Sequence, residues 1–431
     1  MRTRVVVTGM GVVAPNGHGL TAYENALREG ASGIRFIPEM KRLNFACQVG
    51  GVPQNFEATR QGYFDHEELP SINENIGYAC VAAIDAWRDA GLTVPGPREE
   101  NVDWDTGAIC GSGIGGMDTI ASSVVPMVNA GNVRRMGSRI VEQVMNSGTS
   151  ARIAGLLALG NQVTSNSSAC STGNEAIVEA AARIRAGLAK RMLAGGAEGS
   201  SPHIWGGFEA MRVICRKYND RPEQASRPMS ATAAGFVPGS GAAILVLEDL
   251  DSARSRGAKI YAEILGGAVN CGGHRTGGSM TAPNPEGVRR CIRDAMRDAG
   301  VLPGQIDAIN GHLTATFADP HEVWNWSKAL ERGPEEFPYI NATKSLIGHC
   351  LGAAGAIESV AVVLQLYKGF LHPSVNCGDV HPEIAAFAAK IPQRCLAVPQ
   401  LRTIAKAGFG FGDVNSCIIF KKWEEGSLPE D

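Results

Sequence analysis

Short apolar runs recur along the chain, and several are followed by stretches rich in alanine and glycine. The run over residues 5–15 is interrupted by small residues and predicts a buried first strand. The stretch 176–184 predicts a helix that packs closely on several sides, because its side chains are small. Other segments that predict strands are 106–110, 161–164, 243–247 and 261–265.

One pattern occurs twice. Residues 161–184 and 339–365 each run from a strand through a turn of small residues into a helix rich in glycine and alanine. In both, a chemically reactive residue lies at or near the turn. This repetition suggests a duplication.

The segment 248–257 is polar and charged and lies between two apolar runs, so we interpret it as the crossover between two halves. We place the boundary near residue 260, which gives an N-terminal half of residues 1–260 and a C-terminal half of residues 261–431. Segments 17–105 and 200–225 are richer in charge, proline and aromatic residues. We expect them to be cap elements inserted in the N-terminal half.

Composition places the chain among ordinary globular proteins. Its 431 residues can bury a large core. A hydrophobic content of 44% and a net charge of −3 provide no basic excess for nucleic-acid binding. The 11 cysteines are scattered without the spacing of a zinc site or a disulfide framework. They suggest a reducing compartment, and we expect no metal site.

The N-terminus, with two arginines before an apolar run, superficially resembles a signal peptide. However, glycines break the run, and no convincing cleavage site follows. No stretch has the length needed to cross a bilayer. We therefore expect a cytoplasmic protein without membrane insertion, whose acidic tail, residues 424–431, is frayed.

Cys170 is the first candidate for chemistry. It lies between the possible strand at 161–164 and the predicted helix. At such a turn, free backbone N–H groups and the helix dipole favour a thiolate over a thiol. A thiolate can attack an acyl thioester at neutral pH. From this segment alone, a buried and inert cysteine is the more common case.

Two histidines far downstream favour the catalytic interpretation. His312 follows a short apolar strand at 307–311, and His349 ends the segment 339–349 before another helix of small residues. Open α/β sheets place their sites at such strand ends. One cysteine and two histidines suit acyl transfer, in which the sulfur carries the acyl group and the imidazoles stabilise developing oxygen charge.

The segment Gly111–Gly116 has the spacing of a dinucleotide-binding motif and follows a strand-like run. Such a site also needs an acidic residue about 20 positions later. The corresponding region, 133–138, has none. We therefore expect these glycines to permit close backbone packing.

Motifs along almost the whole chain resemble those of one family. The most specific are Lys344-Ser-Leu-Ile-Gly-His349 and the loop Gly408-Phe-Gly-Phe-Gly412, which accompany the Cys170 segment. With these motifs, the chain resembles the elongating β-ketoacyl-acyl-carrier-protein synthases, the ketosynthases of type II fatty-acid and polyketide synthesis in the thiolase superfamily. Further matching segments are 5–15, 111–117, 194–198, 226–228, 235–237 and 257–263.

The resemblance implies an α/β fold with a thiolase-like, five-layered αβαβα core made of two similar halves. It implies a decarboxylative Claisen condensation between an enzyme-bound acyl group and malonyl-acyl carrier protein. The product would be a 3-oxoacyl-acyl carrier protein, in fatty-acid, polyketide or related acyl-chain biosynthesis. No cofactor is implied, because the substrates arrive on the phosphopantetheine arm of acyl carrier protein, the expected partner.

The resemblance also implies roles for single residues. Cys170 would carry the acyl chain, while His312 and His349 would stabilise the malonyl enolate. Lys344 would supply a fixed positive charge, paired with Glu358.

The same resemblance predicts the substrate contacts. The acyl oxygen would lie in a hole formed by the backbone N–H groups of Cys170 and Phe409, and Phe409 would also gate the acyl chain. The residues expected to contact the substrate are Ile114, Thr314, Thr316, Phe409 and Phe411.

Several positions depart from the family pattern. Leu313 stands where the family usually has glycine beside the catalytic histidine, and the stretch 316–322 is one residue shorter than usual. Whether Asp319 and Glu322 match the family's acidic pair therefore stays open. Further departures are Ser240, Lys406 and Asp413. These changes suggest a divergent branch, and the acyl length and pathway stay open.

Two alternatives to a condensing enzyme remain. A degradative thiolase needs a second cysteine near the C-terminal glycine loop, whereas Cys417 lies five residues beyond Gly412 in a strand-like run. A non-catalytic partner subunit, like a chain-length factor, typically lacks the nucleophile that Cys170 provides.

Condensing enzymes of this type are usually dimers, and the strand 161–164 is expected to pair across the two-fold axis. The polar Asn161, Gln162 and Thr164 are tolerable at an edge that hydrogen-bonds to its twin. We favour a homodimer over a heterodimer, with the partner supplying a wall of each acyl tunnel.

Overall fold

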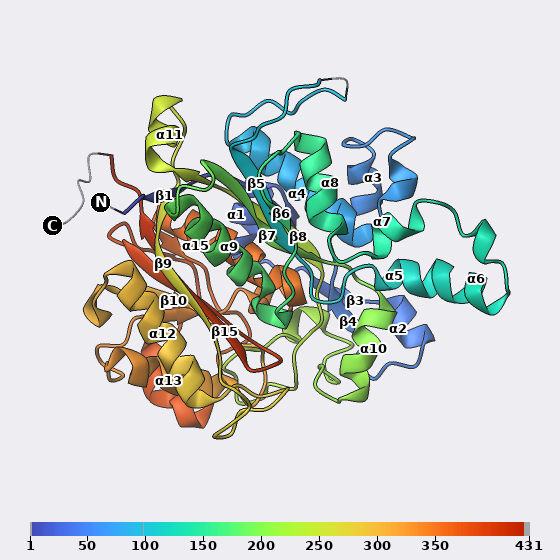
Figure 1. The fold of residues 1–431 in the computed structure, drawn as a ribbon. Coiled ribbons are helices and arrows are strands. Elements are labelled where there is room, and N and C mark those ends of the chain that lie inside the picture. The colour runs from blue at the N-terminus through green and yellow to red at the C-terminus, as the bar shows by residue number, and fades with distance from the viewer. Residues whose placement is uncertain (1, 98, 426–431) are drawn as a thin grey trace.

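A computed structural model describes residues 2–97 and 99–425 of the chain (Figure 1). Within these residues, one mixed sheet has the strand order β11-β10-β14-β15-β9-β1-β8-β7-β5-β6, with β2 paired to β1. The strand bounds are β1 (Val5–Ala14), β2 (Gly17–His18), β5 (Thr106–Gly111), β6 (Val163–Thr164), β7 (Arg191–Glu198), β8 (Gly241–Asp249), β9 (Ala262–Cys271), β10 (Ala308–Asn310), β11 (Tyr339–Asn341), β14 (Thr403–Gly410) and β15 (Val414–Lys422).

The sheet repeats one pairing pattern. From one edge, β6, β5 and β7 are parallel, and β8 and β1 follow antiparallel. From the other edge, β11, β10 and β14 are parallel, and β15 and β9 follow antiparallel. β1 and β9 join the two parts. Two similar halves are therefore confirmed, while the division at residue 260 stays a prediction that falls just before β9.

Helices cover and separate the two parts of the sheet. On one outer face, α4 (Glu74–Asp89) packs on β1 and β8 beside α8 (Gly148–Leu157). On the other, α12 (Pro285–Ala299) packs on β9 and β15 beside α13 (Asp319–Leu330). Between the two parts lie α9 (Thr172–Arg185) and α15 (Ala354–Lys368). The predicted αβαβα order of layers is confirmed.

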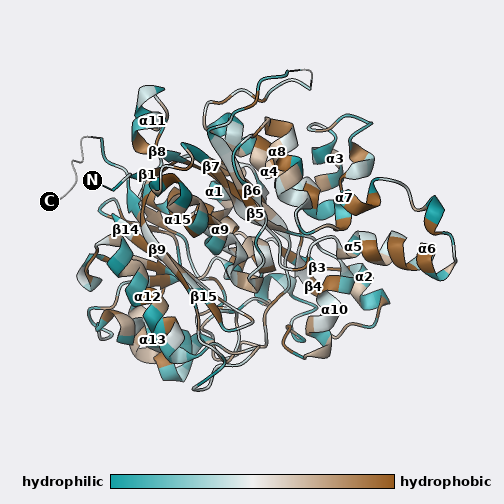
Figure 2. Ribbon diagram, viewed as in Figure 1, coloured by the Kyte–Doolittle hydropathy of each residue, from teal (hydrophilic) through white to brown (hydrophobic). Residues whose placement is uncertain are grey.

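The burial of each helix follows its sequence pattern. In α12, residues 288, 291, 292, 295 and 296 are buried at the spacing of one helical face, and the side chain of Asn284 caps the first turn. Figure 2 accordingly shows mixed polar and apolar colour along this outer helix. In α15, every residue from Ala354 to Leu366 is buried. The expectation that no stretch is long enough to cross a bilayer is wrong, because residues 351–368 are apolar and long enough to do so. However, 89% of that window lies inside the molecule, as is common for a core helix.

Small residues allow the two central helices to meet. A Cβ atom added to Gly173 would lie 2.6 Å from the backbone nitrogen of Ala356. One added to Gly355 would lie 2.6 Å from the backbone nitrogen of Asn174. Both distances are shorter than any tolerable carbon contact, so glycine is required at this crossing. The small-residue stretches in the sequence thus mark the middle layer of the fold.

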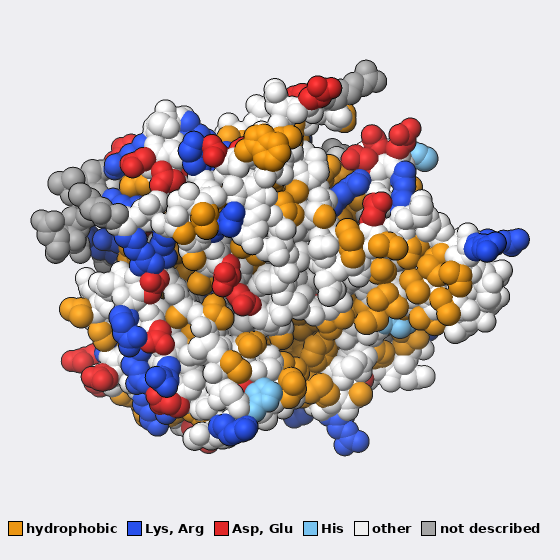
Figure 3. All heavy atoms as spheres, in the orientation of Figure 1, with side chains coloured by type: hydrophobic (Ala, Val, Ile, Leu, Met, Phe, Trp, Pro, Cys, Tyr) orange, Lys and Arg blue, Asp and Glu red, His pale blue; other side chains and the backbone are white. Residues whose placement is uncertain are grey.

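The segments expected to be caps are only partly so. Within 17–105, α4 belongs to an outer core layer, because its apolar face covers β1 and β8. A different segment, 117–145, projects from the body and contains α5 (Met117–Thr119), a π-helical turn (Ile120–Val124), α6 (Val125–Asn129) and α7 (Ile140–Val144). Figure 3 shows apolar side chains gathered over this projection.

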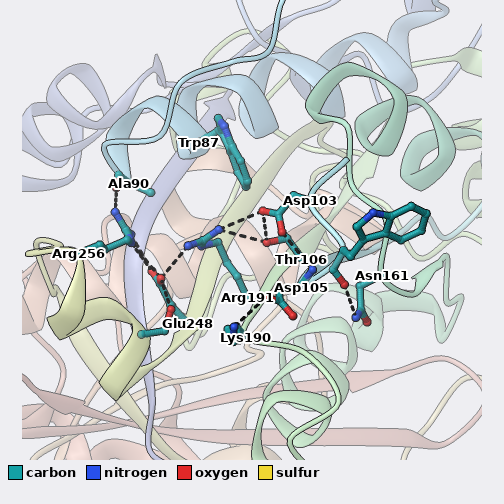
Figure 4. Close-up of polar contacts among 12 residues, drawn as sticks. Trp87, Ala90, Asp103, Asp105, Thr106, Asn161, Lys190, Arg191, Glu248 and Arg256 are labelled. Carbon is teal, nitrogen blue, oxygen red and sulfur yellow. Dashed lines mark hydrogen bonds and ion pairs between the residues drawn. The ribbon is translucent and has the colours of Figure 1, made fainter. Parts of the chain in front are cut away.

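Strong ion pairs mark the crossover between the halves, which contains α11 (Leu250–Ser255). The carboxylate of Glu248 at the end of β8 is buried and pairs with Arg191 at 2.9 Å and Arg256 at 2.7 Å (Figure 4). These two cations hold the pKa of Glu248 below its usual value despite burial. The predicted fraying of the tail concerns residues that, from 426 onward, lie outside the described part of the chain.

Candidate active site

Cys170 lies at the predicted turn before α9. It belongs to a single helical turn, Ala169–Ser171, and Ala169 has a positive φ of 49°. The hydroxyl of Ser171 donates to the carbonyl oxygens of Gly408 and Val414, which ties this turn to the end of β14. The preceding strand, β6, covers only Val163–Thr164 rather than the predicted 161–164.

The tertiary structure brings the cysteine and both histidines together. The Sγ atom of Cys170 lies 3.0 Å from Nε2 of His349. The rings of His312 and His349 meet edge to face with centroids 5.3 Å apart. His312 follows β10, and His349 follows β11 and the short helix α14 (Lys344–Ile347), so both come from carboxyl ends of parallel strands.

The hydrogen bonds of His349 define its tautomer. The backbone N–H of Leu351 donates to Nδ1 of His349 at 3.2 Å, so Nδ1 is the acceptor. In the neutral ring, the proton therefore sits on Nε2 and points at the sulfur of Cys170. Burial, together with Lys344 and Lys406, keeps the pKa values of His312 and His349 well below the usual range. Two neutral imidazoles are suited to donate hydrogen bonds to an oxyanion.

The cysteine differs from the prediction in its protonation. Burial raises the pKa of Cys170 to about 11, although a backbone hydrogen bond from Phe411 and the charge of Lys344 oppose the shift. The prediction that the helix terminus holds a thiolate is therefore wrong for the unliganded protein. Desolvation of the sulfur outweighs the helix terminus, and Cys170 is a thiol at neutral pH.

The predicted ion pair beneath the histidines is present. The Nζ atom of Lys344 lies 2.5 Å from Oε1 of Glu358, and both side chains are buried. A second ammonium shares this carboxylate, because Nζ of Lys406 lies 2.7 Å from Oε2 of Glu358. In the sequence, Lys406 was notable only as a departure from the family pattern, and its charge gave no sign that it is buried.

Two buried carboxylates hold the loop that carries His312. Glu322 accepts the backbone N–H groups of His312 at 2.7 Å and Leu313 at 2.8 Å. Asp319 accepts the backbone N–H groups of Thr314 at 2.9 Å, Ala315 at 3.0 Å and Met229 at 2.8 Å. Both acids therefore shape this loop, while their match to the family's acidic pair stays open. Burial raises the pKa of Glu322 to about 7 and also raises that of Asp319.

Leu313, in the position usual for glycine, has a positive φ of 26°. Its side chain is fully buried in the apolar cluster that includes Val323, Trp326 and Phe409. The two hydrogen bonds to Glu322 and this packing hold the leucine in a conformation that is unfavourable for residues with a Cβ atom.

The glycine loop places its two phenylalanines differently. Phe409 is buried in β14, and its ring lies 6.3 Å from that of His312. Phe411 follows the end of β14, and its backbone N–H hydrogen-bonds the sulfur of Cys170. The backbone contact to the sulfur is thus made by Phe411. The predicted hole for the acyl oxygen, formed by the backbone N–H groups of Cys170 and Phe409, stays a prediction.

A cavity of about 510 Å³ opens at the nucleophile. Its lining includes most of the predicted contacts, namely Cys170, His312, His349, Thr314, Thr316, Phe409 and Phe411. Ile114 does not line it. This residue packs instead in the apolar cluster of Phe208 and Leu351, which do reach the cavity.

The glycines of the apparent dinucleotide motif serve packing, as predicted. A Cβ atom on Gly111 would lie 2.3 Å from the carbonyl oxygen of Asn166, and one on Gly116 would lie 2.1 Å from that of Gln143. No pattern in the sequence indicated a role for Glu198, a fully buried acid. It accepts the backbone N–H groups of Gly113 at 2.9 Å and Gly352 at 3.0 Å, which ties this loop to the segment after His349.

Comparison with known proteins agrees with this geometry. The family model for the N-terminal domain of beta-ketoacyl synthase matches residues 2–253, and the model for its C-terminal domain matches residues 261–378. The chloroplastic 3-oxoacyl-acyl-carrier-protein synthase I of Arabidopsis thaliana is 36% identical over 427 residues, covering 98% of this chain and 87% of the relative. The 3-oxoacyl-acyl-carrier-protein synthase 2 of Vibrio harveyi is 34% identical, covering 98% and 100%.

Solved structures have the same fold. A beta-ketoacyl synthase from Burkholderia phymatum matches with a TM-score of 0.89 at 29% identity, and the ishigamide ketosynthase/chain length factor with 0.87 at 30%. A type II polyketide ketosynthase in complex with its acyl-carrier protein matches with 0.85 at 29%. Each match covers 98% of this chain and 100% of the other. With a cysteine and two histidines meeting at the ends of paired strands, this chain belongs to the beta-ketoacyl synthase family.

Proposed function

We propose that this protein condenses an acyl group on Cys170 with malonyl-acyl carrier protein to give a 3-oxoacyl-acyl carrier protein and carbon dioxide. The observation that carries the proposal is the 3.0 Å contact between Sγ of Cys170 and Nε2 of His349, with His312 beside it. A nucleophile and two neutral hydrogen-bond donors at one cavity match the needs of this reaction.

In the first half-reaction, the sulfur of Cys170 attacks the acyl thioester of a carrier protein. The new bond joins the acyl carbon to Sγ, the bond to the carrier's sulfur breaks, and the thiol proton passes to the departing carrier thiol. We propose that the backbone N–H groups of Cys170 and Phe409 stabilise the acyl oxygen during this exchange.

In the second half-reaction, a malonyl thioester loses carbon dioxide, and the electron pair of the broken carbon–carbon bond moves to the thioester as an enolate. The enolate carbon then bonds to the acyl carbon, the bond between that carbon and Sγ of Cys170 breaks, and the released thiolate takes up a proton from solvent to restore the thiol. His312 and His349 donate hydrogen bonds to the enolate oxygen, and the buried charge of Lys344 supports them. No step requires a metal or a bound cofactor.

The carrier arm would enter through the open side of the cavity. Thr314 and Thr316 line it there and hydrogen-bond to each other at 3.0 Å. Their hydroxyls are placed to hold a pantetheine arm. Acyl carrier protein is therefore the proposed partner, as in the complex of the polyketide relative.

The two alternatives fit the site less well. Cys417 is fully buried in β15 and does not line the cavity at Cys170, so it cannot act as the second cysteine of a thiolase. A non-catalytic partner subunit needs no nucleophile, whereas this chain retains Cys170 with a histidine in contact.

We further propose a cytoplasmic homodimer. The edge strand β6 and the apolar projection 117–145 support this proposal. On that projection, Val125, Val128, Val133 and Val141 have exposed fractions of 47%, 51%, 56% and 66% (Figure 3). Contiguous apolar surface of this kind is typical of an interface between subunits.

Mass spectrometry after incubation with acyl-carrier protein tests the function. The expected acyl adduct is on Cys170, and adding malonyl-carrier should release it as an extended product. A fully active Cys170→Ala variant, or an adduct on another cysteine, would overturn the mechanism. A Cys80→Ala variant, which removes a buried cysteine from α4, is the control for cysteine loss.

A further inference from the structure

Three charged side chains form a buried trio behind the histidines. Lys406 on β14 is 0% exposed, and Lys344 and Glu358 are each 1% exposed. One ammonium contacts each oxygen of the carboxylate, with Lys344 at Oε1 and Lys406 at Oε2. Nζ of Lys406 also donates to the carbonyl oxygen of Ala407.

The charges in this trio do not cancel. Two ammonium groups and one carboxylate leave a positive charge enclosed by protein. A single lysine would already neutralise Glu358, so the second is not explained by ion pairing. Burying an additional charge costs stability, and buried ion pairs are often no more stable than apolar replacements of similar volume. Because neither ion pairing nor stability explains the burial of Lys406, we expect this residue to have a role in the function of the site.

The trio is adjacent to the reacting groups through the chain itself. Lys344 begins α14, which leads into His349, and Lys406 lies on the strand that leads to Phe409 and Phe411. Both ammonium groups lower the pKa values of both histidines, so their field reaches the imidazoles. The pKa of Lys406 is itself lowered by burial, while Glu358 favours its charged form.

On the basis of the proposed function, we propose that Lys406 is a positioning residue for malonyl decarboxylation. By sharing Glu358 with Lys344, it leaves the trio with an uncompensated positive charge. That charge stabilises the enolate oxygen through the histidines that bind it. In acyl loading, the negative charge develops on the acyl oxygen, which is bound by backbone N–H groups instead of the histidines. This step therefore depends on Lys406 much less.

The test changes the net charge of the trio with substitutions that alter the size of the side chains little. Lys406→Met and Lys406→Gln each reduce the trio to a neutral pair, and the amide keeps a hydrogen bond to Glu358. The double variant Lys406→Met with Glu358→Gln restores a single positive charge on Lys344. Lys328→Met, which removes an exposed lysine from α13, is the matched control.

Two rates are measured on the full chain: carbon dioxide release from malonyl-carrier, and acyl transfer to Cys170. Each single variant should lower carbon dioxide release by roughly tenfold or more, and acyl loading by less than about threefold. The double variant should recover most of the lost decarboxylation. Thermal unfolding identifies variants that do not fold, and the glutamine variant replaces the methionine variant if only the latter fails.

A pH profile adds a readout that a purely structural lysine would not change. The cations that act on His312 and His349 are Lys344 and Lys406, and Glu358 pairs with both of them. Cys170 contacts His349, and Glu322 accepts the backbone N–H of His312. Removing one cation makes both imidazoles easier to protonate. The acid limb of the decarboxylation profile should therefore move to higher pH in Lys406→Met and return toward wild type in the double variant.

Each result decides a different claim. If the wild-type protein releases no carbon dioxide from malonyl-carrier, the proposed function fails. If the wild type is active and Lys406→Met matches it, or the double variant is no better than the single one, the inference about Lys406 fails while the function stands.

Discussion

Cys170 and His349 form a neutral pair at rest, because burial raises the pKa of the thiol and lowers that of the imidazole. Contact with a substrate carbonyl, rather than a stored thiolate, must then start acyl transfer. In the proposed mechanism the helix terminus still contributes at that moment, because the backbone N–H of Cys170 is a proposed donor to the acyl oxygen.

The protonation of Cys170 predicts a slow and pH-dependent alkylation. Because only the thiolate reacts and the pKa is about 11, the rate with iodoacetamide should rise about tenfold per pH unit between pH 7 and 10. Peptide mass spectrometry separates this site from Cys271, an exposed cysteine. A fast, pH-independent reaction above pH 7 would restore the original prediction of a thiolate.

The tautomer of His349 predicts unequal effects on the two half-reactions. Alanine at His312 or His349 removes a donor to the enolate, which should cost roughly two to three powers of ten in decarboxylation. Acyl loading should fall less. Rapid-quench measurement of each half-reaction checks this, with His66→Ala as an exposed control. An equal loss in both would make the histidine a base toward Cys170.

At the scale of elements, α13 and the loop 312–316 act as one unit. The first turn of the helix supplies both Asp319 and Glu322, whose carboxylates accept the loop's N–H groups. Their spacing of three residues puts both on the same helical face. The strained loop is therefore held by the helix that follows it, which compensates for leucine in place of glycine at position 313.

Glu322 predicts a pH-dependent stability. Its folded pKa of about 7 exceeds the ordinary value of 4.5, so the folded state binds the proton more tightly. The resulting stabilisation is complete below pH 4.5 and is lost as the pH rises through 7. Relative to Glu322→Gln, the wild-type free energy of unfolding should fall by on the order of 3 kcal/mol across this window. Urea unfolding at several pH values measures it, and parallel profiles for the two proteins would contradict it.

At the scale of the whole molecule, one edge of the sheet ends in the two residues of β6. Asn161 lies outside the strand, and its side chain donates to the carbonyl oxygens of Trp104 and Leu188. These contacts fix Asn161 beside the edge at which we propose that a second copy pairs.

Light scattering at micromolar concentration should therefore give about twice the 45.4 kDa of the chain. Val128→Glu together with Val133→Glu places charge on the apolar projection and should yield monomers, whereas glutamate at the exposed Leu302 is the control. A stable wild-type monomer with full activity would reject the dimer.

The family, the two-fold repetition and the residues that meet at the site could be predicted from the sequence. The family follows from the resemblance of several motifs, including the Cys170 segment, to those of known ketosynthases. The repetition and the site follow from local patterns: apolar strands, small residues in the helices, and reactive residues at strand ends. The close contacts at Gly173 and Gly355 explain why the small-residue patterns predict the packing of the central helices, since no other residue fits at these two positions.

The electrostatics of the site, in contrast, depend on the tertiary structure. The pKa of Cys170, the sharing of Glu358 by Lys344 and Lys406, and the roles of Asp319 and Glu322 all depend on burial and on contacts between distant segments. The contact between the backbone N–H of Phe411 and the sulfur likewise depends on how the segment after β14 lies against Cys170. Local sequence indicates the strands, the helices and the reactive residues, but desolvation and charge pairing arise only when the layers of the fold pack together.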